Sequence, residues 1–184
     1  MRVTRVVASL SLALVALAIS GCSPKKEPMP LLVVVDEEGW ATVSFQVCAG
    51  EAVRIAGVSL GQDEPALLHG EVSRSFDEDT TIELTINADT IEQGRLTDEL
   101  PLSTFRPFPA PTGLGDLERL TVVTSGHHAG LDLRAHELRP DTEVIVFGTK
   151  TDSEYSVSPI GEVEGREIVD GWCDSEREAG RLEN

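Results

Sequence analysis

Short segments of alternating apolar and polar residues constrain the fold of this chain more than any other feature. Every second residue is apolar from Ala41 to Val47 and again from Ile82 to Ile86. Successive side chains of a strand point to opposite faces, so each segment predicts a strand with one buried and one solvated face. Similar segments recur at short spacing, and no stretch sustains the 3.6-residue period of a helix. The pattern predicts an all-β fold, an antiparallel β-sandwich.

The other segments of the predicted sandwich are less regular. The β-branched run Leu31–Val35 opens the domain, and a change of apolar parity at Gly57 predicts a bulge or a break. The polar stretch 88–100 has room for a helical turn. We predict one domain over residues 31–173, followed by a polar tail, 174–184, that is frayed or briefly helical. Further strands are expected at 120–124, 131–133 and 155–163.

The N-terminus has the layout of a secretory signal peptide. Arg2 and Arg5 precede an apolar run over residues 6–19, and small residues follow it. Its 14 residues would span about 21 Å as a helix, less than the ~30 Å hydrocarbon core of a bilayer. Pro24 disfavours a longer helix. We therefore expect residues 1–21 to be removed on export.

The residues Ile19-Ser20-Gly21-Cys22 resemble the lipobox of bacterial lipoproteins. The resemblance implies cleavage before Cys22, thioether diacylation of its sulfur, and a mature chain tethered to the outer face of the cell membrane. Residues 22–30 then form a proline-rich, extended tether. Lys25 and Lys26 either add on the order of 1 kcal/mol each at an anionic surface or are merely solvated. An ordinary secreted chain with a free Cys22 thiol is the alternative.

Cys48 and Cys173 are the only cysteines besides Cys22. An even pair in an exported chain predicts a disulfide, with buried thiols or a metal pair as alternatives. The bond would enclose 124 residues, nearly the whole domain. Chain entropy gives about 5 kcal/mol of stabilisation for a loop of this length.

Acidic residues outnumber basic ones by 32 to 15, for a net charge of −17. Loss of Arg2 and Arg5 with the signal peptide leaves 13 basic residues and a charge of −19. Such a chain lacks the basic footprint that nucleic acid requires. The charge permits a cationic partner and disfavours contact between the domain body and an anionic bilayer.

The segment 138–148 resembles the approach to the sixth strand of fibronectin type III domains. The family places a leucine, a proline and a threonine before an aromatic residue and alternating valines; the matching residues are Leu138, Pro140, Thr142 and Val146. Val144 stands where that family usually has the tyrosine of its corner hydrogen bond. The resemblance implies a sandwich and no activity.

The one histidine cluster is His127-His128, with His136 eight residues further on. Adjacent residues of a strand face opposite sides, so the pair is no ready chelate. A solvated turn after Ser125-Gly126 is the favoured interpretation. A metal carrier or envelope enzyme that uses His127, His128 and His136 is the alternative.

Phe105 and Phe108 lie in a proline- and glycine-rich loop, residues 101–113. A proline-flanked aromatic pair suits an exposed anchor for a protein partner, and packing over one end of the sandwich is the competing interpretation. Trp172, next to Cys173, is expected to pack near the disulfide.

No known catalytic motif is present: the chain has no nucleophile elbow, phosphate loop, dinucleotide fingerprint or zinc-protease helix. We expect no enzyme activity, no cofactor and no metal. Asp77-Glu78-Asp79 is too compressed for a calcium loop and predicts a charged turn. The best hypothesis is a membrane-anchored lipoprotein whose acidic sandwich binds a protein or ligand in the cell envelope, with residues 101–113 as the candidate surface.

Overall fold

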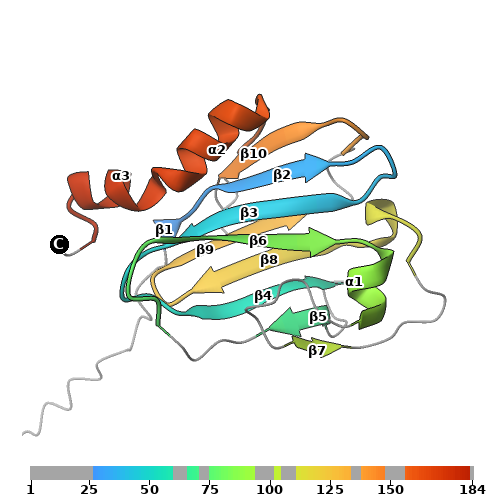
Figure 1. Cartoon of the computed structure of the whole chain (residues 1–184), viewed down its shortest axis with the longest axis horizontal. Helices are drawn as coiled ribbons and strands as arrows, with labels where there is room; N and C mark the ends of the chain where they lie inside the picture. Colours follow the sequence, from blue (N-terminus) through green and yellow to red (C-terminus); the bar gives the residue numbers. More distant parts are fainter. Residues whose placement is uncertain are drawn as a thin grey trace, which may run out of the picture.

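The strands of the computed structural model pair into two sheets that stack face to face, which confirms the predicted antiparallel β-sandwich (Figure 1). The structure describes residues 27–59, 66–70, 75–93, 102–104, 111–133, 138–147 and 156–182. In chain order the elements are β1 (Glu27–Pro28), β2 (Leu31–Val35), β3 (Ala41–Val47), β4 (Val53–Ser59), β5 (Ala66–Gly70), β6 (Thr80–Ile86), α1 (Ala88–Gln93), β7 (Leu102–Thr104), the 3-10 turn η1 (Leu114–Asp116), β8 (Arg119–Thr124), β9 (His127–Asp132), β10 (Glu143–Phe147), β11 (Ser156–Pro159), α2 (Glu162–Asp170) and α3 (Trp172–Glu178).

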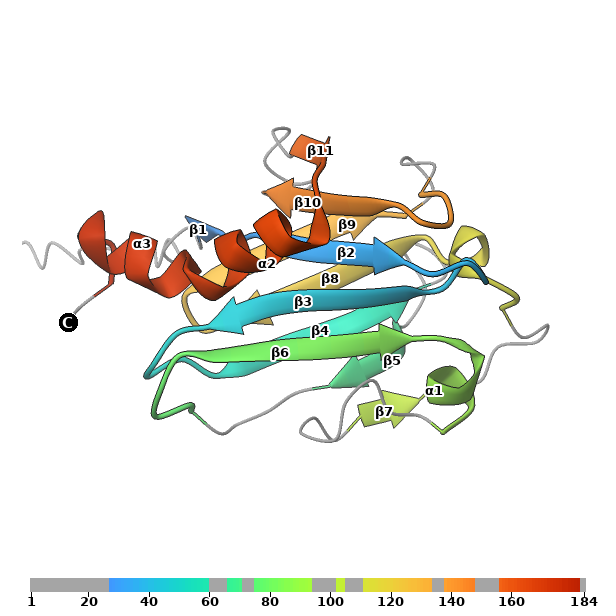
Figure 2. The ribbon, with the colours of Figure 1, turned by 45° about the horizontal axis from the view of Figure 1, so that its top comes forward.

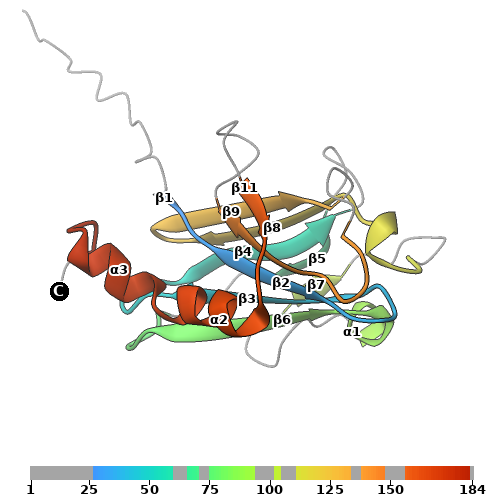
Figure 3. The same ribbon diagram turned by 90° about the horizontal axis from the view of Figure 1, so that it is seen from above.

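The two sheets form separate layers when the molecule is seen from above (Figure 3). The first has the strand order β11-β10-β2-β3-β6, and the second has the order β1-β9-β8-β4-β5-β7. All pairings of these strands are antiparallel except that of β1 with β9. The segment 138–148 enters β10, an inner strand that lies between β2 and β11.

The core lies between the layers. Val43 of β3 is level with Val33 of β2 and Leu84 of β6, so the apolar residues of the three strands share one face. They meet an equivalent face of the second sheet. Fully buried side chains at the centre include Phe45, Leu84, Val58, Leu120 and Leu131. The alternation in the sequence therefore predicts the inner face of each sheet correctly.

The outer face of β3 is buried as well, which contradicts the expectation of a half-solvated strand. Ser44 is 2 % exposed and Gln46 is 7 % exposed. The cause is α2, which lies across β2, β3 and β10 on the outside of the first sheet (Figure 2). The polar side chains of Ser44 and Gln46 predicted a solvent-exposed face, but α2 covers that face.

The C-terminal region belongs to the domain. The brief helix that was one of the two predictions for residues 174–184 is present as part of α3, but the boundary of the domain at residue 173 is corrected. Residues 162–178 form α2 and α3, and Glu176 of α3 is fully buried. α2 escaped prediction because it buries only Gly165 and Val169, while Val163 is 76 % exposed. One glycine and one valine make no visible apolar stripe.

The domain also begins earlier than Leu31. Glu27–Pro28 forms β1 and pairs in parallel with His127 and His128 at the start of β9, and Met29 is fully buried. The last residues of the predicted tether, 27–30, are thus part of the sandwich. β1 and α3 lie at the same end of the molecule, and α1 lies at the opposite end (Figure 1).

β4, α1 and β7 test three further predictions from the sequence. β4 runs continuously through Gly57, and its register shifts fall instead at Val53/Ile55 and at Val58/Ser59. The helical turn expected within 88–100 is confirmed as α1. The loop 101–113 contains a short strand, β7, which pairs with β5.

Candidate functional site

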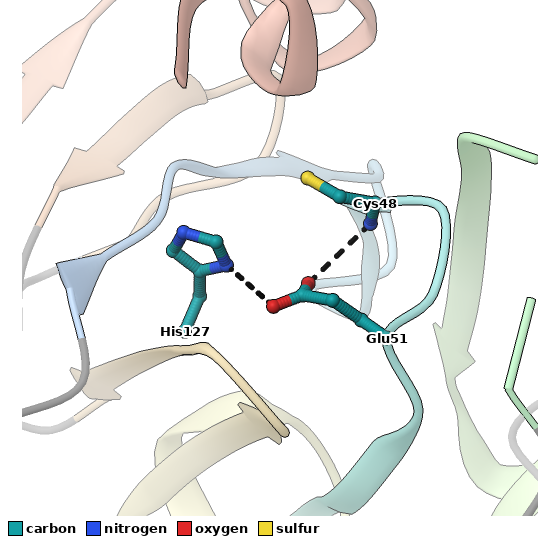
Figure 4. Close-up of side chains that lie close together, drawn as sticks. All are labelled: Cys48, Glu51 and His127. Atoms are coloured by element: carbon teal, nitrogen blue, oxygen red, sulfur yellow. Dashed lines mark hydrogen bonds and ion pairs between the residues drawn. The ribbon is translucent and has the colours of Figure 1, made fainter. Parts of the chain in front are cut away.

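A buried cluster of ionisable side chains lies at the end of the sandwich that carries β1 and α3. Cys48 directly follows β3, Glu51 occupies the turn before β4, and His127 is the first residue of β9. The three side chains converge from different segments of chain (Figure 4). The β3–β4 turn is tightened by the Glu51 N–H, which donates to the Cys48 carbonyl at 2.9 Å.

Glu51 and His127 form the central contact. Nδ1 of His127 lies 2.9 Å from Oε1 of Glu51, and both residues are buried, at 3 % and 6 % exposure respectively. The other carboxylate oxygen of Glu51 accepts from the Thr124 hydroxyl at 3.3 Å and from the Cys48 N–H at 3.4 Å. Thr124 Oγ1 also accepts from the His127 N–H at 2.8 Å, so it fixes both partners.

A second carboxylate reaches the histidine from α3. Oε2 of Glu176 lies 3.7 Å from Nε2 of His127. Arg181 donates to the same carboxylate from two nitrogens, at 2.7 and 2.5 Å. With His127 protonated, two acidic and two basic groups balance each other, which a buried cluster requires.

The two carboxylates decide the protonation state of His127. Burial alone would lower the His127 pKa, but the hydrogen bond and charge of Glu51, together with Glu176, outweigh burial and raise the pKa above 6.5. Burial likewise would raise the Glu51 pKa, yet the contacts with His127, Cys48 and Thr124 lower it below 4.5. At pH 6.5 and below, the favoured state is therefore an imidazolium between carboxylates.

The Cys48–Cys173 disulfide is present beside this cluster, as predicted. It joins the end of β3 to α3 across 125 positions of sequence, with 5.4 Å between the Cα atoms. The ring of Trp172 meets the His127 ring edge-on, with 5.9 Å between centroids. The expected location of Trp172 near the disulfide agrees with this contact.

Hydrogen bonds and an ion pair also join the C-terminal helices to the first sheet. Gln46 accepts from the Cys173 N–H at 2.8 Å and donates to the Asp170 carbonyl at 2.6 Å. Arg177 of α3 forms a two-nitrogen ion pair with Asp79, the last residue of the acidic turn before β6. The acidic turn before β6 is therefore a docking point for α3.

The solvated-turn interpretation of the histidine cluster is wrong for His127. Its side chain is buried, and both ring nitrogens face carboxylates. His128 is the next residue of β9, so its side chain belongs to the other face of the strand. His136, Phe105, Phe108 and Cys22 lie outside the described residues.

Sequence reasoning missed Glu51 and Glu176. Both lie three positions from a cysteine, Glu51 after Cys48 and Glu176 after Cys173. The predicted disulfide brings the two cysteines together, so it also brings the two glutamates into one neighbourhood. That proximity was available from the sequence, but the inward direction of each carboxylate was not.

Fold and cluster together define a class: an antiparallel β-sandwich with one helix, α2, on its outer face and a second, α3, joined by a disulfide to the end of β3. Comparison with known proteins found no matching protein family, no similar curated protein and no similar solved structure. Among the helices of the described residues, none is long and apolar enough to cross a membrane.

Proposed function

We propose that the chain is a lipid-anchored lipoprotein of the bacterial cell envelope, whose acidic sandwich binds a protein or ligand outside the cytoplasm. One observation carries the proposal: the lipobox-like Ile19-Ser20-Gly21-Cys22 lies directly before the folded domain. Only residues 23–26 separate Cys22 from β1. A disulfide in the domain fits an oxidising compartment.

The position of β1 supports a particular orientation at the membrane. Four extended residues reach about 12 Å at ~3.1 Å each, so the end with β1 and α3 would face the bilayer closely. The opposite end, with α1, would point away (Figure 1). Such a short tether favours a partner that comes to the membrane surface.

The far end is also where the candidate binding loop is attached. The Leu114 N–H donates to the Gly39 carbonyl in the β2–β3 turn, and Thr112 donates to the Asp116 carboxylate from its N–H and its hydroxyl. The C-terminal root of the loop 101–113 is thereby held against the sandwich. Loops on a rigid scaffold are suited to binding.

The charge of the mature chain supports the same arrangement. A net charge of −19 would repel the domain body from anionic lipid headgroups, while Lys25 and Lys26 lie beside the anchor. Contact with the membrane would then be confined to the lipid and the tether. A cationic or polar partner surface fits the outward end best.

Cell fractionation with site-directed cross-linking tests the proposal. The full chain and its Cys22→Ser variant would be expressed in a bacterium, with a photoreactive residue at Gln93 of α1 or at Glu178 of α3. We expect membrane association that depends on Cys22, and protein adducts from position 93 but not from position 178. Membrane association without Cys22 would contradict the anchor, and equal adducts from both positions would contradict the orientation.

A further inference from the structure

Three potential metal ligands lie together at the end of the sandwich that carries β1 and α3. Cys48 Sγ, a carboxylate oxygen of Glu51 and a ring nitrogen of His127 are all within 4.8 Å of one another, and all three residues are buried (Figure 4). Thiolate, imidazole and carboxylate are the donors that Zn²⁺ takes in proteins. In the disulfide form, the Cys48 sulfur is bonded to Cys173 and is no thiolate ligand.

We propose that the dithiol form of the chain binds one zinc ion through Cys48, Cys173, Glu51 and His127. The Cys173 sulfur supplies the fourth ligand because it already adjoins that of Cys48. In a tetrahedral site with Zn–S near 2.3 Å, ligand atoms lie roughly 3.5–3.8 Å apart. The two sulfurs must separate once the disulfide is reduced, and Glu51 Oε1 and His127 Nδ1, now 2.9 Å apart, must open slightly around the ion. This inference is independent of membrane anchoring.

Non-covalent contacts hold the two cysteines close when the disulfide is absent. The Gln46 amide bridges the Cys173 N–H and the Asp170 carbonyl, so it ties β3 to the junction of α2 and α3. The Thr81 hydroxyl donates to the Asp170 carboxylate at 2.7 Å, and Arg177 pairs with Asp79. The helices therefore remain docked, and a chelating set of ligands is preserved.

The groups around His127 suit a zinc ligand. If Nδ1 binds the metal on the Glu51 side, Nε2–H faces the Glu176 carboxylate. A carboxylate behind a histidine ligand fixes its tautomer and increases its basicity. Thr124 orients Glu51 by donating to its Oε2. Arg181 compensates the charge of Glu176.

The dithiol is the form in which the chain is synthesised, so zinc binding and disulfide formation compete during folding. Zinc binding releases the two thiol protons and the His127 proton. A disulfide oxidant reverses it: the two thiolates give up two electrons and form the Cys48–Cys173 bond, the oxidant leaves as two thiolates, and Zn²⁺ is released. The cluster would therefore bind metal before oxidation and serve as a structural ion cluster afterwards.

Cobalt(II) spectroscopy tests the site directly. The full chain with Cys22→Ser, so that Cys48 and Cys173 are its only cysteines, is unfolded and reduced with a phosphine and then refolded in the same reductant. We expect one equivalent of Co²⁺ to give thiolate-to-cobalt absorption and tetrahedral visible bands. Zn²⁺ should displace Co²⁺, and an added disulfide oxidant should abolish the bands.

Matched variants separate this site from simple thiol binding. Glu51→Gln and His127→Gln should each weaken Co²⁺ binding by at least about 10-fold, since each removes a ligand. Glu164→Gln on α2 and His128→Gln should leave it unchanged. Equal binding by all four variants would overturn the proposal, as would the absence of thiolate bands in the reduced parent. Loss of the β-sheet circular dichroism on reduction, before metal is added, would also overturn it.

Discussion

The contact between Glu51 and His127 requires that residue 126 has no side chain. A Cβ at this position would overlap Oε1 of Glu51, the oxygen that contacts His127. The backbone of Gly126 does not require a glycine, because its φ is not positive. The constraint is therefore the contact between Glu51 and His127, not the turn.

We predict that Gly126→Ala destabilises the protein by about 1–3 kcal/mol, because the methyl group pushes the Glu51 carboxylate off His127 and leaves buried charges unpaired. Urea denaturation would measure the loss in the free energy of unfolding. Gly115→Ala, where a Cβ meets nothing within 4 Å, is the matched control. Equal stability of the two variants would contradict the prediction.

The pKa shifts of the same pair predict how stability depends on pH in the disulfide form. The raised His127 pKa gives stabilisation that is fully present below pH 6.5 and is lost as the pH rises through the folded-state value. The lowered Glu51 pKa gives stabilisation that is present above pH 4.5 and is lost as the pH falls through its folded-state value.

Urea denaturation across this range, with a chelator present, tests the prediction. We expect the free energy of unfolding of the parent to fall as the pH rises above 6.5, and His127→Gln to remove that fall. The variant should be the less stable of the two at pH 6, where the charged forms of both His127 and Glu51 are favoured. Parallel pH profiles of the parent and His127→Gln would contradict the assignment.

At the scale of elements, the contact between α2 and the first sheet decides how the outer face is covered. Gly165 of α2 leaves no room for a side chain: a Cβ there would lie 2.5 Å from Cδ1 of Leu32 and 3.2 Å from Cγ2 of Ile160. Leu32 is fully buried and has little room to move. The helix accepts a glycine at its centre because the sheet lies against it.

We predict that Gly165→Ala destabilises the protein although alanine favours a helix by about 1 kcal/mol. Overpacking against Leu32 costs about 1–3 kcal/mol and exceeds that gain. A double-mutant cycle with Leu32→Val would measure the coupling, since the smaller side chain makes room for the added methyl group. Additive effects of the two substitutions would show that Leu32 is not the obstacle.

These elements mark the limit of what the sequence predicts. Alternation predicted the inner faces of β3 and β6, and the even cysteine pair predicted the disulfide. Ser44 and Gln46 indicated a solvated face because a strand pattern shows polarity, not what covers it. α2 presents Gly165 and Val169 to the sheet, so its buried side has too few apolar side chains for a helix to be recognised from the sequence.

The burial of His127 within the cluster was not predictable, for a similar reason. His127 lies next to another histidine after a Ser-Gly turn, a context typical of solvated residues. Its burial depends on α3, which brings Glu176 and Trp172 from the far end of the sequence. Because α3 is distant in the sequence and has no recognisable apolar stripe, the residues around His127 give no indication that it is buried.

At the scale of the whole molecule, one disulfide joins the first third of the chain to its last helix. Replacing Cys48 and Cys173 together with alanine should lower the free energy of unfolding by up to about 5 kcal/mol, because the bond closes a loop of 125 positions. The core between the sheets and the contacts of Gln46 should keep the variant folded. Urea denaturation of the variant and the oxidised parent measures the difference; a loss below about 1 kcal/mol would contradict it.

The proposed anchor would place the disulfide, the ion cluster and β1 at the membrane side and leave the loop end for partners. This arrangement assigns different tasks to the two ends of the sandwich. The near end would hold the C-terminal helices in place, and the far end would present the binding surface. Both assignments depend on the chain being tethered at Cys22.

Intact-mass spectrometry of the protein purified from membranes, before and after reduction, tests that account most directly. The account predicts the mass of residues 22–184 plus a lipid modification on Cys22, with a gain of two hydrogen atoms on reduction of Cys48–Cys173. An unmodified Cys22 would contradict the membrane anchor, and a mass unchanged by reduction would contradict the disulfide that fastens the C-terminal helices to the sandwich.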